Sequence, residues 1–261
     1  YAYTFYIPSR QKNGESSGEY LARLKEYETH LGILSVYFSR LDKKVQDRLN
    51  FAKFDDIYAQ DFVEKKYNAT RRVIMTKVPM CEQSDLTKFI FNSGELQTYE
   101  EKVECFLTLV YDTMKVLKIL HEKNVYILDI KPRNIFVCSD RRQKGFRGYT
   151  FSFGDLDMAQ ICASKSITRK PGKCESNLTT LFYTPTNALN VEKGFRKLYG
   201  DQGYAIRDAY ALSKSLLVAF NNMMLPNNFL LFNENKYYEW DLAPPKIRFK
   251  AWREYMFQNL S

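Results

Sequence analysis

The sequence contains no apolar run long enough to cross a bilayer. In its 261 residues, no stretch approaches the roughly 20 apolar residues that a transmembrane helix needs. The amino-terminal segment YAYTFYIPSR also lacks the basic start and apolar centre of a secretory signal. We therefore expect a domain that is not transmembrane, and a signal peptide removed before Tyr1 is compatible with these residues.

Internal repeats, low-complexity tracts and Pro/Gly/Ser linkers are also missing. Their absence excludes solenoid arrays and strings of independent domains. The 45% hydrophobic and 15% aromatic content is enough to bury a large core. The composition therefore favours one large domain or two tightly packed lobes.

None of the five cysteines lies in a C-x-x-C pair, so no pattern typical of a zinc or redox site is present. We expect Cys105 and Cys138 to be buried free thiols. Cys162 and Cys174 share one loop-like segment. They could stay reduced or form a disulfide in an oxidising compartment, and the sequence leaves both states open.

Acidic residues are in the minority among the charged residues. The 30 Asp and Glu against 39 Lys and Arg leave a formal net charge of +9. This excess favours acidic partners such as phosphates, and peripheral contact with an anionic membrane surface. We do not expect nucleic-acid binding, because no stacking motif or Lys/Arg block resembles a known nucleic-acid-binding module.

The first third of the chain predicts two strands and a helix. Alternating aromatic residues at 1–8 favour a strand that ends at a proline. Leucines recur at helical spacing over residues 19–34, and the serines of segment 16–18 could cap this helix. Glu28 falls on the same apolar stripe. The run around residues 73–75 is typical of a buried strand.

Three further helices are predicted. A short helix opens at Ser84 and Asp85, and a very apolar segment at 207–220 is a candidate for a buried central helix. The strongest helical pattern covers residues 98–121. Its predicted apolar face consists of Val103, Phe106, Leu107, Val110, Met114 and Leu117. Residues 161–180 are polar and aperiodic, as a long surface loop would be.

A group of polar residues follows the long helix. Asp129, Lys131 and Asn134 form the pattern D-x-K-P-x-N, and Asp155 comes at the end of the next predicted strand. Phosphoryl transfer needs these residue types: a carboxylate to orient the attacking hydroxyl, an amide and a carboxylate to hold Mg²⁺, and a cation to offset charge. Asp129 fits the first role, Asn134 and Asp155 the second, and Lys131 the third.

In this order and spacing, the chain resembles the protein kinase superfamily. Its catalytic loop corresponds to residues 127–134 and its D-F-G metal motif to Asp155-Leu156-Asp157. Asp208, in RDAYAL, matches the aspartate with which the family caps the catalytic-loop backbone. The resemblance implies an α+β, two-lobed fold with a reduced amino-terminal lobe at 1–76 and a mainly helical carboxy-terminal lobe at 77–261. It also implies ATP and Mg²⁺ as cofactors, bound weakly if at all.

The chain departs from the family pattern mainly before residue 80. No glycine-rich loop precedes the first strand, and Tyr6 stands where the family has its phosphate-binding lysine. Lys12 or Arg10 could reach inward instead. The resemblance places Tyr6, Glu28 and Met75 beside the nucleotide, with Glu26 as the competing register for the helix glutamate.

Other departures lie in the carboxy-terminal part. Ile127 and Leu128 replace the family's His and Arg, which makes control through activation-loop phosphorylation doubtful. Asp157 replaces a glycine and adds a carboxylate, and Thr186 stands where the family has a glutamate.

These departures resemble the secreted rhoptry and dense-granule kinases of apicomplexan parasites that lack a glycine loop, and most closely the bradyzoite pseudokinase. The resemblance implies a monomeric pseudokinase that binds protein partners as a scaffold, secreted by a parasite to the parasitophorous vacuole or cyst wall. An atypical active Ser/Thr kinase is the alternative, because Asp129, Lys131 and Asn134 are retained. A small-molecule phosphotransferase is a more distant third.

Overall fold

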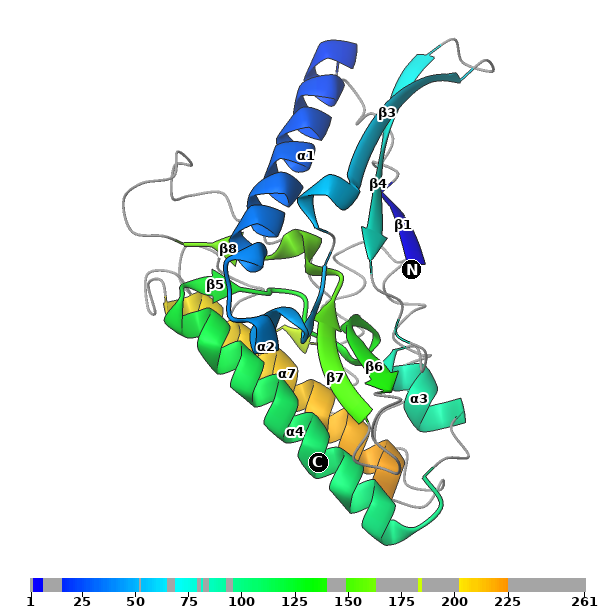
Figure 1. Ribbon diagram of the computed structural model, residues 1–261, viewed down its shortest axis with the longest axis vertical. Coiled ribbons are helices and arrows are strands. Elements are labelled where there is room, and N and C mark those ends of the chain that lie inside the picture. Colours follow the sequence, from blue (N-terminus) through cyan, green and yellow to red (C-terminus); the bar gives the residue numbers. More distant parts are fainter. Residues whose placement is uncertain are drawn as a thin grey trace, which may run out of the picture.

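The computed structural model describes residues 2–6, 16–51, 53–64, 69–78, 81, 85–92, 96–139, 149–162, 183–184 and 202–224. The helices and mainly antiparallel strands form an α+β structure with two parts, each containing a sheet and at least one helix (Figure 1). One part contains a three-stranded sheet and helix α1. The other contains a second three-stranded sheet, the long helices α4 and α7, and the residues predicted to form the phosphoryl-transfer site.

The first sheet has the strand order β1-β4-β3, with β1 at Ala2–Tyr6, β3 at Ile57–Glu64 and β4 at Ala69–Val78. Both strand pairs are antiparallel. Ile74 of β4 is fully buried, whereas Tyr58 of β3 is 46% exposed. Met75 pairs with Tyr58, and side chains alternate along a strand, so Met75 belongs to the face opposite Ile74.

Helix α1 runs from Ser17 to Ser39 beside this sheet (Figure 1). The predicted cap is present: Ser16 accepts a hydrogen bond from the Glu19 amide, and the Glu19 side chain accepts one from the Ser16 amide. The helix continues five residues past the predicted end at Leu34, since 39 − 34 = 5. Burial of Phe38 in the core explains the extra turn.

Two short elements follow: α2 at Lys43–Gln46 and β2 at Leu49–Asn50. A single 3-10 turn, η1 at Phe54–Asp56, then leads into β3.

The second sheet has the order β2-β7-β6, with β6 at Ile135–Ser139 and β7 at Tyr149–Gly154. β6 and β7 are antiparallel, and β2 is parallel to β7. Short strands β5 (Val125–Tyr126) and β8 (Gln160–Ile161) pair separately. The single-turn helices η2 (Pro132–Asn134) and η4 (Leu156–Met158) follow β5 and β7.

Helix α4 (Tyr99–Glu122) packs against β7 of the second sheet, α7 (Gln202–Met224) lies beside α4, and α3 spans Leu86–Asn92 (Figure 1). All three helices begin within five residues of their predicted starts. The core between them is fully enclosed around Leu109, Leu120, Ile135, Val137, Phe151 and Phe153.

The predicted apolar face of α4 is wrong by part of a turn. Leu107 and Met114 are 60% and 56% exposed. The residues of α4 that are buried instead are Cys105, Leu109, Asp112, Thr113, Val116, Leu117 and Leu120. Apolar side chains occur on more than one side of this helix, and hydrophobic spacing could not show that Asp112 would be buried by a specific partner. Its carboxylate accepts from the Phe151 amide and pairs with Arg48.

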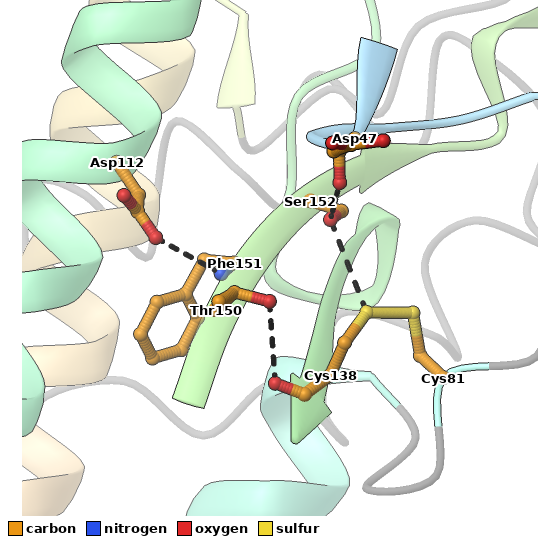
Figure 2. Close-up of a disulfide and its surroundings, with 7 residues drawn as sticks. All are labelled: Asp47, Cys81, Asp112, Cys138, Thr150, Phe151 and Ser152. Carbon is orange, nitrogen blue, oxygen red and sulfur yellow. Dashed lines mark hydrogen bonds between the residues drawn. A yellow bond between two sulfur atoms is a disulfide. The ribbon is translucent and has the colours of Figure 1, made fainter. Parts of the chain in front are cut away.

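Cys138 is not the free thiol predicted from the sequence, because it forms a disulfide with Cys81 (Figure 2). Cys105 is a buried free thiol as predicted, and burial, with a smaller contribution from Glu104, raises its pKa to about 12. Cys174 lies outside the described residues, so a bond between Cys162 and Cys174 stays a prediction. Within the described part, no helix has both the length and the apolarity to cross a membrane.

Candidate functional site

The three residues predicted in the catalytic loop lie together between β5 and β6. Lys131 Nζ lies 2.8 Å from Asp129 Oδ2. Asn134 Nδ2 donates to the Asp129 carbonyl at 2.9 Å and to Asp129 Oδ2 at 3.1 Å. Asp129 and Asn134 are buried, at 8% and 4% exposure. This network fixes the carboxylate of Asp129 between a cation and an amide.

Asp208 of α7 binds the backbone of the catalytic loop, and its side chain is fully buried. Its two carboxylate oxygens accept hydrogen bonds from the backbone N–H groups of Ile127 at 2.8 Å and Leu128 at 2.7 Å. His121 Nε2 at the end of α4 lies 3.1 Å from the same carboxylate. These are the backbone contacts that the family resemblance implies for Asp208.

The backbone at Leu128 is strained, with φ at 69°. A left-handed conformation at a bulky residue is uncommon and persists where surrounding contacts impose it. The hydrogen bond from its amide to Asp208 is such a contact. The loop is therefore held in a specific conformation by α7, immediately before Asp129.

Asp155 follows β7 and also has a left-handed backbone, with φ at 52°. Gly154 precedes it, and a Cβ atom at this position would overlap the ring of Phe136 on the neighbouring strand. A glycine is thus required for the close approach of β6 to the start of residues 155–157, called the metal loop below. Within the second sheet, β6 and β7 bring Asn134 and Asp155 to the same end of their hairpin.

Carboxylates are crowded at this end of the hairpin. The pKa of Asp155 is raised mainly by loss of solvation; Lys131 opposes this shift and Asp129 adds to it. Asp155 is exposed to solvent. Burial, then repulsion from Asp155, raises the pKa of Asp157 to about 7.

Helix α1 contacts the metal loop through two residues that sequence reasoning did not select. Tyr27 donates its hydroxyl proton to Asp157 Oδ2 at 2.8 Å, and His30 Nε2 lies 3.1 Å from the Asp157 carbonyl. A signal existed: the buried residues Tyr20, Leu24, Leu31, Leu34 and Phe38 are spaced by three, four and seven, and Tyr27 fills the gap in that series.

The structure describes fewer contacts for the residues predicted to hold the nucleotide. Glu28 is half-buried and follows Tyr27 on α1, while Glu26 is exposed. Tyr6 ends β1, where its Cα pairs with that of Ile74, but its side chain lies outside the described part. Met75 belongs to the face of the first sheet opposite the buried Ile74. Arg10, Lys12 and Thr186 also lie outside the described residues.

Asn134 and Asp155 have the donor atoms for Mg²⁺, which proteins commonly hold through one or two carboxylates with waters and phosphates completing the shell. The raised pKa of Asp155 among other carboxylates fits such a site, because a cation would relieve the repulsion. In the described residues, no three His, Cys, Asp or Glu side chains form a metal-binding group by themselves.

Comparison with known proteins gives one informative similarity. No family model matches the chain. The chain is 26% identical over 152 residues to the mitosis inhibitor protein kinase wee1 of Schizosaccharomyces pombe. The match covers 58% of this chain and 14% of that protein. The similarity supports a relationship to the protein kinase superfamily, and the mixed helices and strands are compatible with a kinase-like α+β fold.

Proposed function

We propose that this chain is a pseudokinase: a two-lobed, kinase-like regulator that binds protein partners and keeps a degenerate site for Mg²⁺ and ATP. The observation that carries the proposal is the hydrogen bond from Tyr27 to Asp157. It occupies the junction of α1 and the metal loop, where the family resemblance implies a glutamate that pairs with a lysine. A neutral phenol supplies no positive charge for phosphates.

The added negative charge of Asp157 also supports a pseudokinase. The family has a glycine at this position, whereas this chain adds a buried carboxylate beside Asp155. When ionised, it would repel a bound polyphosphate at short range. Asn134 and Asp155 would hold Mg²⁺, and the metal would supply the charge neutralisation that lets a nucleotide bind at all.

The arrangement of Asp129, Lys131 and Asn134 favours the alternative, an atypical active Ser/Thr kinase. Transfer of a phosphoryl group depends mainly on positioning and charge, and these three side chains are already connected by hydrogen bonds. In that case Asp129 would orient the substrate hydroxyl, and Lys131 would offset charge on the transferred group.

The disulfide supports a compartment outside the reducing cytosol, because such bonds persist mainly in secreted proteins. We propose secretion by a parasite, to the parasitophorous vacuole or cyst wall, with the chain acting as a monomer on a protein partner. Its charge of +9 is suited to peripheral contact with an anionic membrane.

Thermal-shift titration separates the two functions when it is combined with a transfer assay. We expect a shift with ATP and Mg²⁺ that Asp155→Asn abolishes, and no transfer above that of Asp129→Ala. Asp47→Ala is the matched control, because this exposed aspartate caps the carboxy-terminal end of α2. Transfer that Asp47→Ala retains and Asp129→Ala loses would establish the active kinase instead. Absence of any shift would contradict the nucleotide site.

A further inference from the structure

The disulfide attaches a second segment to the β6–β7 hairpin, whose opposite end carries the candidate metal residues Asn134 and Asp155. Cys81 lies between β4 and α3, on the connection from the first sheet to the helical part of the molecule. Cys138 lies on β6, 57 residues later. Figure 2 shows the bond at the edge of the β6–β7 hairpin, with Cys138 next to Ser152. Both cysteines are half-buried, so neither is enclosed in the core.

The two faces of β6 have different roles. Ile135 and Val137 are fully buried in the core, which anchors the inner face of the strand. Phe136 and Cys138 alternate with them and belong to the other face. At the free edge of β6, Asp85, immediately before α3, makes an isolated antiparallel β-bridge to Phe136. The β4–α3 connection is thus attached to β6 by a covalent bond and by this bridge.

This outer face leads directly to the metal loop. The ring of Phe136 lies against Gly154, and Asp155 is the next residue. Asn134 immediately precedes β6. The outer face of β6 is therefore continuous, through Phe136 and Gly154, with the end of the hairpin that carries the two residues proposed to hold Mg²⁺.

We propose that the Cys81–Cys138 disulfide is a redox-controlled clamp on the metal site. A dithiol reductant would break the S–S bond. Two electrons and two protons pass to the cysteines, which become thiols, while the reductant forms its own disulfide. Cys81 is then released from β6, and Phe136 and Gly154 lose part of their support. The clamp is closed in an oxidising compartment and open in a reducing one; only its effect on nucleotide affinity rests on the proposed function.

Native-state hydrogen exchange tests the clamp without any ligand. The folded protein is treated with dithiothreitol, alkylated with iodoacetamide and checked by mass spectrometry for modification at Cys81 and Cys138. We expect backbone amides of residues 134–139 and 150–155 to exchange several-fold faster after reduction, while those of α4 and α7 are unchanged. Mg²⁺–ATP affinity, measured on the same two samples, should fall several-fold.

The double variant Cys81→Ser/Cys138→Ser should reproduce the reduced state without reductant. Cys105→Ser is the matched control, because it removes a buried free thiol and leaves the disulfide intact. Unchanged exchange in the alkylated protein, a disulfide that opens only in denaturant, or global unfolding on reduction would each overturn the clamp. Redox-dependent exchange with no ATP binding in either state would uphold the clamp and contradict the proposed nucleotide site.

Discussion

The two parts of the molecule hold the candidate site by different means. The helical part fixes Asp129 and Asn134 through buried contacts, with the fully enclosed Asp208 beneath the loop. In the other part, helix α1 reaches the site through polar contacts of Tyr27 and His30 to Asp157. Buried backbone contacts specify geometry more strongly than partly exposed side-chain hydrogen bonds. The backbone conformation of the metal loop should therefore be less sensitive to substitutions in α1 than to substitutions in α7.

Among the substitutions that test this comparison, loss of the Asp208 carboxylate should lower the free energy of unfolding the most. Asp208→Ala leaves two buried amides without their acceptor, so we expect the free energy of unfolding to fall by about 3 to 5 kcal/mol. Asp208→Asn keeps a carbonyl acceptor and should lose less. Urea denaturation followed by circular dichroism measures both. Asp47→Ala, at an exposed ion pair, should stay within about 1 kcal/mol of the parent. A similar small effect for Asp208→Ala would contradict the anchoring role.

Gly154 tests the close packing of β6 against the metal loop. Gly154→Ala places a methyl group into the ring of Phe136, and we expect a loss of about 1 to 3 kcal/mol from this overpacking. Weaker binding of Mg²⁺–ATP should accompany it.

Gly18→Ala provides the control for this substitution. Open space surrounds Gly18 in the first turn of α1, so alanine should be neutral or stabilising by up to about 1 kcal/mol there. Equal effects of the two substitutions would show that helix and strand propensity, and not contact with Phe136, determines the result.

The sequence could predict the start of α1 and the residues of the catalytic loop, because these constraints are local or come in ordered motifs. Ser16 and Glu19 form a complete capping box, and Asp129, Asn134 and Asp208 lie at fixed separations that a resemblance can transfer. The Cys81–Cys138 bond could not be predicted in this way. It depends on which strand lies beside the β4–α3 connection, and that is a property of the tertiary structure.

The α1 contact shows a second limit of sequence reasoning. Glu28 was selected because the family has a glutamate on this helix, while Tyr27 was overlooked because tyrosine is ordinary in an apolar stripe. The choice between adjacent positions depends on a helix rotation of about 100°. Only packing against the metal loop fixes that rotation, through Tyr27 and His30.

The pH dependence of stability should report the crowded carboxylates. Asp157 titrates near 3.8 when unfolded and at about 7 in the folded chain, so the folded state binds the extra proton between these values. Stability is therefore greatest below the unfolded pKa and falls as pH rises towards 7, by at most about 1.4 kcal/mol per pH unit. Asp157→Asn should flatten this slope in urea denaturation at several pH values. An unchanged slope would mean that Asp157 is ionised throughout.

The smallest expected effect comes from the hydroxyl of Tyr27. Tyr27→Phe removes the hydrogen bond that favours ionised Asp157, so stability should fall by about 1 kcal/mol at neutral pH. Since that bond lowers the pKa of Asp157, the midpoint of the pH-dependent loss of stability should move upward.

Tyr37→Phe is a matched control, because Tyr37 lies on the same helix and donates to the Lys123 carbonyl at 3.1 Å, away from the carboxylates. It should cost similar stability and leave the pH midpoint unchanged. If both variants shifted the midpoint, the effect would be a general loosening of α1. If only Tyr27→Phe does so, the phenolic hydrogen bond from α1 sets the protonation of Asp157, and it can be altered without disturbing the anchor at Asp208.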